Sequence, residues 1–239
     1  RPYYTDLQRF AFVASVDGTR DYFQFRRPIE PGNAINLAQR SAVIGGITRI
    51  GSRGRLKLVG LSLTHSESHV DSTTVVIDRT GFQRDTGEAL GRRYRGQNVV
   101  RANALAGIRL MRFTPVQGFD ALTGTQDIRV GLQVGVYNGT AIDIGAARDR
   151  DRFMASGLYA GAGNAKMFVG TQWIGEARND QGANAWDNHV VSGRLAWYFR
   201  PAVRQLTLLS SEWSEGRDMR TPFQLTFADR TGGILGHRR

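Results

Sequence analysis

The stretch that decides the fold is "DIRVGLQVGVYNG", residues 127–139, in which two kinds of side chain alternate. One set of alternate positions is apolar and comprises Ile128, Val130, Leu132, Val134 and Val136. The other set is small or polar and comprises Arg129, Gly131, Gln133, Gly135 and Tyr137. Because successive side chains of a strand point to opposite faces, this pattern predicts a β-strand with one apolar face. That face fills the interior of a soluble barrel, whereas it meets lipid in an outer-membrane barrel.

Composition narrows the class of protein. The formal net charge of the 239 residues is +11, and almost all the basic residues are arginine, with lysine only at Lys57 and Lys166. The arginines are scattered, whereas nucleic-acid-binding proteins concentrate basic residues on one face or helix, so we expect no nucleic-acid partner. Cysteine is absent, which excludes disulfides and thiolate metal sites. No apolar run approaches the ~20 residues of a membrane-spanning helix.

The alternation of residues 127–139 recurs along the whole chain. In "LQRFAFVASV", residues 7–16, one face carries Phe10, Phe12, Ala14 and Val16. Residues 99–113 and 189–200 alternate in the same way, and residues 72–82 are rich in β-branched residues, which favour strands. About eleven or twelve strands follow from this count, most near the ~10 residues of a membrane strand. The sequence therefore predicts an all-β, antiparallel barrel made of one domain, residues 1–239.

Connections between the predicted strands differ in length. Tight turns are predicted at Gly163–Asn164 and at residues 200–203, and long polar loops at residues 84–98, 117–127 and 178–188. Short turns at one end and long loops at the other are typical of outer-membrane barrels. Aromatic residues near strand ends suggest an interfacial girdle of Phe113, Phe153, Trp173, Trp197, Tyr198 and Phe199. A soluble β-sandwich or barrel with an apolar core remains the alternative.

The segment "HSESH" contains His65, Ser66, Glu67 and His69, which are residue types found in metal sites and in hydrolases. On a strand the two histidines lie ~13 Å apart, too far to share one ion. Adjacent residues of a strand also point to opposite faces, so Ser66 and its neighbours cannot form a nucleophile and base. We expect no metal site, no cofactor and no enzymatic activity.

Three stretches together resemble the Omp85 superfamily, the BamA-like or surface-antigen (D15-type) outer-membrane proteins. They are "RPYYTDLQRFAFVAS" (residues 1–15), "LMRFTPVQGFDALTGTQDIRVGLQVGV" (110–136) and "LTFADRTGGILGHRR" (225–239). The last is similar to the loop that bears the arginine–glycine–aromatic signature of that superfamily. The matching positions are Gly233, Ile234, Leu235, Gly236 and His237, with Leu235 in place of the arginine and His237 in place of the aromatic residue.

This resemblance implies a sixteen-stranded barrel whose signature loop follows roughly the eleventh strand. The chain is then expected to be the first two-thirds of such a barrel, truncated within that loop and without periplasmic modules. The implied location is the bacterial outer membrane, and the implied partners are membrane lipid and client outer-membrane polypeptides. The implied function is insertion of outer-membrane proteins, or translocation of polypeptide or lipid. The first strand, with Phe10, Phe12, Ala14 and Val16, would form one side of a lateral seam.

Two other functions stay open at this point. A passive, porin-like channel would be anion-selective if arginines line its lumen. A soluble β-barrel could instead bind an anionic ligand.

Overall fold

The computed structural model describes residues 9–25, 32–52, 54–71, 75–78, 81–84, 93–120, 124–145 and 147–222. Its regular secondary structure is a set of antiparallel strands, as the alternating pattern predicts. They are β1 (Phe10–Phe25), β2 (Gly32–Ser52), β3 (Arg55–Val70), β4 (Val75–Asp78), β5 (Gly81–Arg84), β6 (Gln97–Gln117), β7 (Thr125–Ala141), β8 (Asp151–Gly163), β9 (Met167–Asp180), β10 (Ala185–Ala202) and β11 (Gln205–Arg217). The described residues contain no helix long and apolar enough to cross a membrane.

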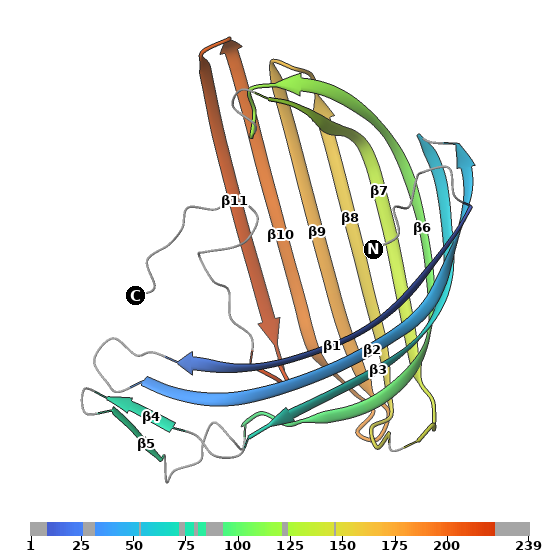
Figure 1. Cartoon of the computed structure of the whole chain (residues 1–239), viewed down its shortest axis with the longest axis vertical. Coiled ribbons are helices and arrows are strands. Elements are labelled where there is room, and N and C mark those ends of the chain that lie inside the picture. The colour runs from blue at the N-terminus through green and yellow to red at the C-terminus, as the bar shows by residue number, and fades with distance from the viewer. Residues whose placement is uncertain are drawn as a thin grey trace.

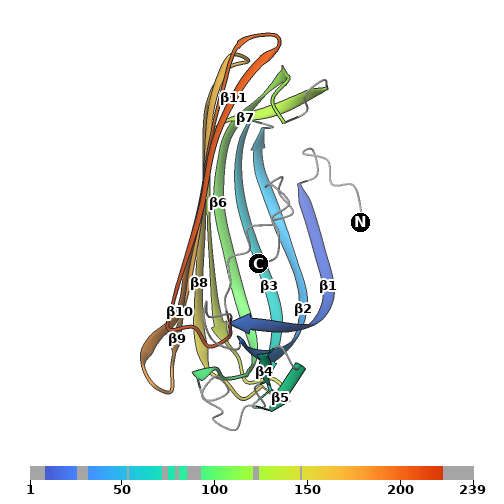
Figure 2. The same cartoon turned by 90° about the vertical axis from the view of Figure 1, so that its left-hand side faces the viewer.

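All eleven strands belong to one sheet. Its order is β11-β10-β9-β8-β7-β6-β3-β2, with β1 beside β2 and the β4–β5 hairpin paired to the start of β2. The sheet curls into a deep trough, concave on one side and convex on the other (Figures 1 and 2). In the described residues β1 and β11 are its two long edges and do not pair with each other. The predicted all-β antiparallel architecture is confirmed, with the sheet open.

Three details of the predicted layout differ in the structure. Nine of the strands have 13 to 21 residues, longer than predicted. In and just beyond the β-branched stretch 72–82, the described residues form two four-residue strands, β4 and β5, which pair with each other. The long loop predicted at 117–127 is expected at the end opposite the tight turns, but it connects β6 to β7 at the same end as those turns. The reason is that β6 and β8 both run antiparallel to β7, so β6 and β8 end on the same side of the sheet.

The strand register assigns each residue to a face. Leu110 of β6 pairs with Leu132 of β7, while the neighbouring Arg109 pairs with Gln133. Leu110 and Leu132 are exposed, whereas the side chains of Arg109 and Gln133 hydrogen-bond to each other at 2.9 Å. Ser62 of β3 hydrogen-bonds to Tyr137 of β7 at 3.2 Å, across the intervening strand β6. Side chains two strands apart can meet only on the inner side of a curved sheet, so the polar side is the concave one.

The convex face carries the apolar side chains, and they are exposed. On β1 these are Phe10, Phe12 and Val16; on β3 Val59, Leu61 and Leu63; on β8 Met154 and Leu158; and on β10 Val191, Leu195 and Phe199. Val16 is 84% exposed and Phe12 is 73% exposed, values far above those of core residues. The apolar face predicted from the sequence therefore points away from the interior of the trough.

Alternation changes phase near one end of β7, which corrects the prediction that Ile128 shares one face with Leu132, Val134 and Val136. Leu132 is exposed on the convex side, but Ile128 is buried in a cluster with Phe168 and Tyr198. Between them Gly131 has φ +132°, and a Cβ there would lie 2.1 Å from the Leu110 carbonyl oxygen, so only glycine fits. Beyond this point the β6–β7 hairpin bends over the concave side (Figures 1 and 2).

The hairpin end closes the trough with its main apolar cluster. Val116, Phe119 and Ile128 pack there against Phe168 and Tyr198 from β9 and β10. The Phe119 ring stacks on Tyr198 with centroids 4.9 Å apart. This cluster is the principal buried apolar core among the described residues, and it fixes one end of the concave surface.

Candidate functional site

The concave face is lined by polar side chains aligned across six strands. One continuous row, set by the register of β6 to β11, contains Arg109, Gln133, Tyr159, Gln172, Arg194 and Glu212. Arg109 donates to Gln133, and Arg194 forms a 3.2 Å ion pair with Glu212. The Arg129 guanidinium lies 4.3 Å above the Tyr159 ring. Such a surface suits water or a polar ligand rather than an apolar core.

A buried ion pair lies near the end opposite the apolar cluster. Arg101 of β6 donates through Nε and Nη2 to the two carboxylate oxygens of Asp151 of β8, at 2.7 and 2.5 Å. Their side chains are 5% and 1% exposed. This bidentate geometry satisfies both charges, which is the condition under which a buried pair is tolerated.

Arg178 of β9 adds a second guanidinium next to that pair. The Phe153 ring lies 5.6 Å from the guanidinium carbon of Arg101 and 5.4 Å from that of Arg178. Arg178 donates through Nη1 to the side-chain oxygen of Gln97 on β6. In the described residues its Nε is buried without an acceptor.

Arg220, just after β11, ties the chain back onto the β9–β10 hairpin. It donates through Nε to Asp187 at 2.6 Å and through Nη2 to Asp180 at 3.1 Å. Arg95 donates to the same two carboxylates, at 2.9 and 3.2 Å. The Arg220 backbone is held as well, since its N–H donates to Asn188 and its carbonyl accepts from the Arg95 N–H. The segment is therefore clamped by both side chain and backbone.

The pKa of the Asp180 carboxyl is lower than that of a free aspartate. Burial alone would raise its pKa, but hydrogen bonds from the Ala183 and Gly182 N–H groups and the charges of Arg95 and Arg220 outweigh burial and lower the pKa. A carboxyl whose pKa is lowered on folding stabilises the protein above its unfolded pKa of about 4, and this contribution is lost as the pH falls through the folded value.

We therefore expect Asp180→Asn to lower the melting temperature at pH 7, because two arginines lose a shared carboxylate. The deficit relative to the parent protein should shrink below about pH 4 and close once Asp180 is protonated in the folded state. Melting curves of both proteins between pH 7 and pH 2 check this. A deficit that stays constant over this range would show that charge is not its cause.

The residues predicted for the lateral seam lie together on β1. Phe10, Phe12, Ala14 and Val16 share the convex face, opposite Thr48, Gly46, Ile44 and Ala42 of β2. The signature-loop candidates Gly233, Ile234, Leu235, Gly236 and His237 lie outside the described residues.

The residues of "HSESH" lie on β3, as the sequence predicts. His65 hydrogen-bonds to Asn98 at 3.1 Å, and Ser66 accepts a hydrogen bond from Gln97. In the described part of the chain no three His, Cys, Asp or Glu side chains gather closely enough to hold a metal ion.

The predicted aromatic girdle divides between the two faces. Phe153 and Tyr198 face the concave side, where they contact arginines and the apolar cluster. Trp173 and Phe199 are exposed on the convex side, and Trp197 stacks on Phe199 at 5.8 Å. Strand-end position alone could not separate these two groups, because adjacent residues such as Trp197 and Tyr198 point in opposite directions.

The sequence does not predict the arginine cluster, that is, Arg101, Arg178 and Arg220 at one end of the concave face. The sequence does contain one trace of it, which is a row of polar residues on the face of a strand opposite its apolar face. The polar residues are Gln97, Arg101, Asn103 and Arg109, and the apolar ones between them are Ala102, Ala104, Ala106 and Ile108. The pattern shows that these residues share a face. It does not show which strand carries their partners, because Asp151 lies 50 residues away from Arg101.

Comparison with known proteins identifies no relative: no family model, no curated protein and no solved structure matches the chain.

Proposed function

We propose that this chain forms the wall of an outer-membrane β-barrel of the Omp85 type, which inserts outer-membrane proteins or translocates polypeptide or lipid. The observation that carries the proposal is the distribution of side chains between the faces. The convex surface is exposed and apolar, while the concave surface holds the ion pairs and hydrogen bonds. A soluble β-protein has the reverse arrangement, and a membrane barrel has this one.

The tryptophans on the convex side agree with the thickness of a membrane. Trp186 and Trp197 of β10 share that side and are eleven residues apart. A register shift between Asp187 and Val190 allows them to share a face and leaves a span of ten strand residues, that from Val169 to Asn179 on β9. At ~3.4 Å per residue and a strand tilt of ~40°, they would be separated by about 26 Å along the membrane normal. This is close to the ~25 Å apolar band, flanked by aromatic residues, of known outer-membrane barrels.

The open edge supports an insertion role over a passive one. β1 pairs with β2 along its whole length, and its other edge has no strand beside it among the described residues. An unpaired strand edge exposes backbone donors and acceptors that can pair with another strand. On the convex side of this strand, Phe10, Phe12 and Val16 would keep a client strand in contact with lipid.

A passive anion-selective channel is the second candidate, and the concave arginines favour it. Arg109, Arg129 and Arg194 lie on the concave surface between the two ends of the trough. Positively charged residues lining a pore attract anions. The two functions make different predictions in vesicles. An insertase accelerates the folding of a second barrel protein, whereas a channel conducts chloride without doing so.

The membrane location is tested by lipid-borne quenchers. All four tryptophans, Trp173, Trp186, Trp197 and Trp213, lie on the convex side. We expect bromine at the middle of the acyl chain to quench Trp173 more strongly than Trp186, since Trp173 pairs with Gly193, between Trp186 and Trp197 of β10, and would lie nearer the centre of a membrane. Single-tryptophan variants, made by Trp→Phe at the other three sites, provide the measurement. Equal, weak quenching of both residues would contradict a membrane-spanning sheet.

The insertion function is tested by adding the chain to vesicles and timing the folding of a small, unrelated outer-membrane barrel. We expect faster folding than in empty vesicles. Val16→Pro and Ala14→Pro, which place proline on the exposed edge strand, should reduce the acceleration, since proline cannot donate to a strand ladder. Chloride conductance without accelerated folding would favour the channel instead.

A further inference from the structure

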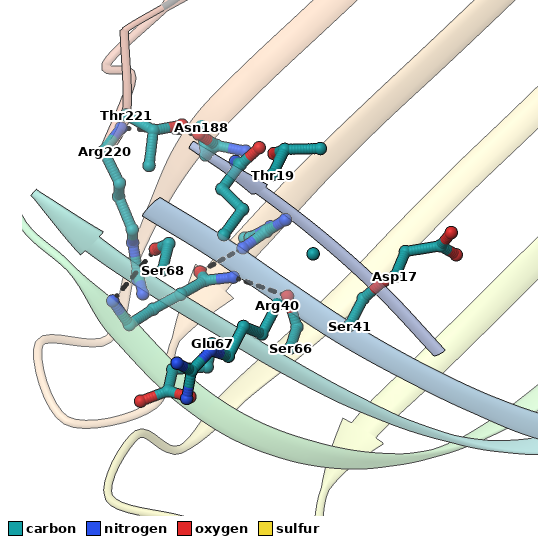
Figure 3. Close-up of a pocket in the computed structure, with 14 residues that line it drawn as sticks. Asp17, Thr19, Arg40, Ser41, Ser66, Glu67, Ser68, Asn188, Arg220 and Thr221 are labelled. Carbon is teal, nitrogen blue, oxygen red and sulfur yellow. Dashed lines mark hydrogen bonds between the residues drawn. The ribbon is translucent and has the colours of Figure 1, made fainter. Parts of the chain in front are cut away.

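A cavity of about 250 Å³ lies on the concave side, between β1–β3 and the ends of β9 and β10 (Figure 3). We propose that it binds the phosphate group of a small molecule or lipid headgroup. The proposal is independent of the insertion function, since it depends on the donors that line this cavity.

Arg178 supplies a cation that forms no direct ion pair among the described residues, although the charges of Asp151 and Glu176 act on it from nearby. The ion pairs of the described residues join the neighbouring Arg101 to Asp151, and Arg220 to Asp180 and Asp187, but none includes Arg178. Its Nη1 donates to Gln97, while its Nε is buried and without an acceptor. A buried N–H group without a partner is unfavourable, so an anion that accepts from Arg178 would be stabilised here.

Two serine hydroxyls on β3 are fixed as donors. Gln97 donates through Nε2 to the Ser66 oxygen at 3.2 Å and through its backbone N–H to the Ser68 oxygen at 3.1 Å. Because each serine oxygen accepts one hydrogen bond from Gln97, its own O–H remains able to donate to a third group. Figure 3 shows Ser66 and Ser68 on the β3 side of the cavity. Gln97 thus joins these hydroxyls to the arginine in one network.

Asn188 contributes a further donor from β10. Its side-chain oxygen accepts the Arg220 N–H, so its Nδ2 group is the end of the amide left to donate. The residue is only 5% exposed, and it lies beside Arg220 and Thr221 at the edge of the cavity (Figure 3). Donors therefore approach the cavity from β3, β9 and β10.

Two carboxylate residues, Asp17 and Glu67, line the cavity, and neither forms an ion pair with Arg178 among the described residues. Glu67 lies between Ser66 and Ser68 in sequence, so its side chain points to the opposite face of β3. Asp17 lines the cavity from β1 but lies at the end far from Arg220 (Figure 3). A guanidinium with several neutral donors around it favours a tetrahedral oxyanion, which accepts hydrogen bonds from several directions.

The test measures binding of inorganic phosphate to the full chain, folded in detergent micelles, by isothermal titration calorimetry. We expect Arg178→Gln to weaken binding by about tenfold or more, because a charge-assisted hydrogen bond is lost. Arg109→Gln is the matched control: it removes an arginine from the same concave face outside the cavity, and it should change the affinity by less than about twofold. Unfolding curves of both variants verify that they are folded.

The same titration identifies the source of the phosphate. Tighter binding of a short-chain phosphatidylglycerol than of inorganic phosphate would assign the site to a lipid headgroup, and the reverse order would assign it to a free phosphate. Both orders support the site. Absence of binding by either probe would overturn it, as would an Arg178→Gln protein that binds like the parent. An equal loss in Arg109→Gln would also overturn it, by showing attraction to the whole concave face.

Discussion

Asp151→Asn is expected to destabilise the protein by about 3–5 kcal/mol, because it leaves the buried guanidinium of Arg101 without a counter-charge. Both side chains of this pair are almost completely inaccessible to water. Asparagine fills the same volume and can still accept one hydrogen bond, so the loss reports the missing charge rather than a cavity. The free energy of unfolding, from denaturant titration in micelles or vesicles, is the quantity to compare.

The chain contains a matched control for this prediction. Asp143 and Arg150 form the same kind of pair, with a 2.7 Å contact, but their side chains are 73% and 67% exposed. Asp143→Asn should therefore change the free energy of unfolding by less than about 1 kcal/mol. A double variant, Arg101→Met with Asp151→Leu, should recover most of the lost stability, since a buried pair can be replaced by apolar side chains at little cost. Equal effects of Asp151→Asn and Asp143→Asn would contradict the argument.

Most of the fold could be predicted because period-two alternation is a local property. The strand limits of β8 and β9 and the tight turn between them follow from residues 152–178 alone, and the structure agrees. The shared face of Phe10, Phe12, Ala14 and Val16 follows in the same way. Where a glycine takes φ +132°, as Gly131 does, alternation no longer indicates the face, so the sequence pattern predicts the wrong side for Ile128.

The candidate site could not be predicted, because it is assembled from segments distant in sequence. Arg178 meets Gln97 across 81 residues, and Arg220 meets Asp180 across 40. Nothing in the local pattern of either arginine distinguishes it from the exposed arginines of the chain, such as Arg150. Only the order of strands in the sheet brings these side chains to one end of the trough, and this order depends on pairing over the whole chain.

The direction of the apolar face is the property on which the membrane proposal depends, and one pair of substitutions tests it. Leu158 on the convex side and Ile174 on the concave side are apolar, partly exposed residues of adjacent strands. In a bilayer we expect Leu158→Arg to destabilise the folded protein by about 2–4 kcal/mol, the cost of an arginine near the centre of the apolar band. Leu158 lies between Arg152 and Ala162, near the middle of its strand, so the full cost should apply.

Ile174→Arg introduces the same side chain one row away, but on the face that already carries Gln172 and Arg178. We expect it to change stability by less than about 1 kcal/mol, because on the proposed arrangement its guanidinium would meet water on the concave side. Unfolding titrations of both variants in phospholipid vesicles give the comparison. If the chain were instead a soluble protein, Leu158 would lie in water, and both substitutions would have effects within about 0.5 kcal/mol of each other. A much larger loss of unfolding free energy in Leu158→Arg than in Ile174→Arg would therefore indicate that the convex surface faces lipid rather than water. The comparison uses the same chemical change at two neighbouring positions.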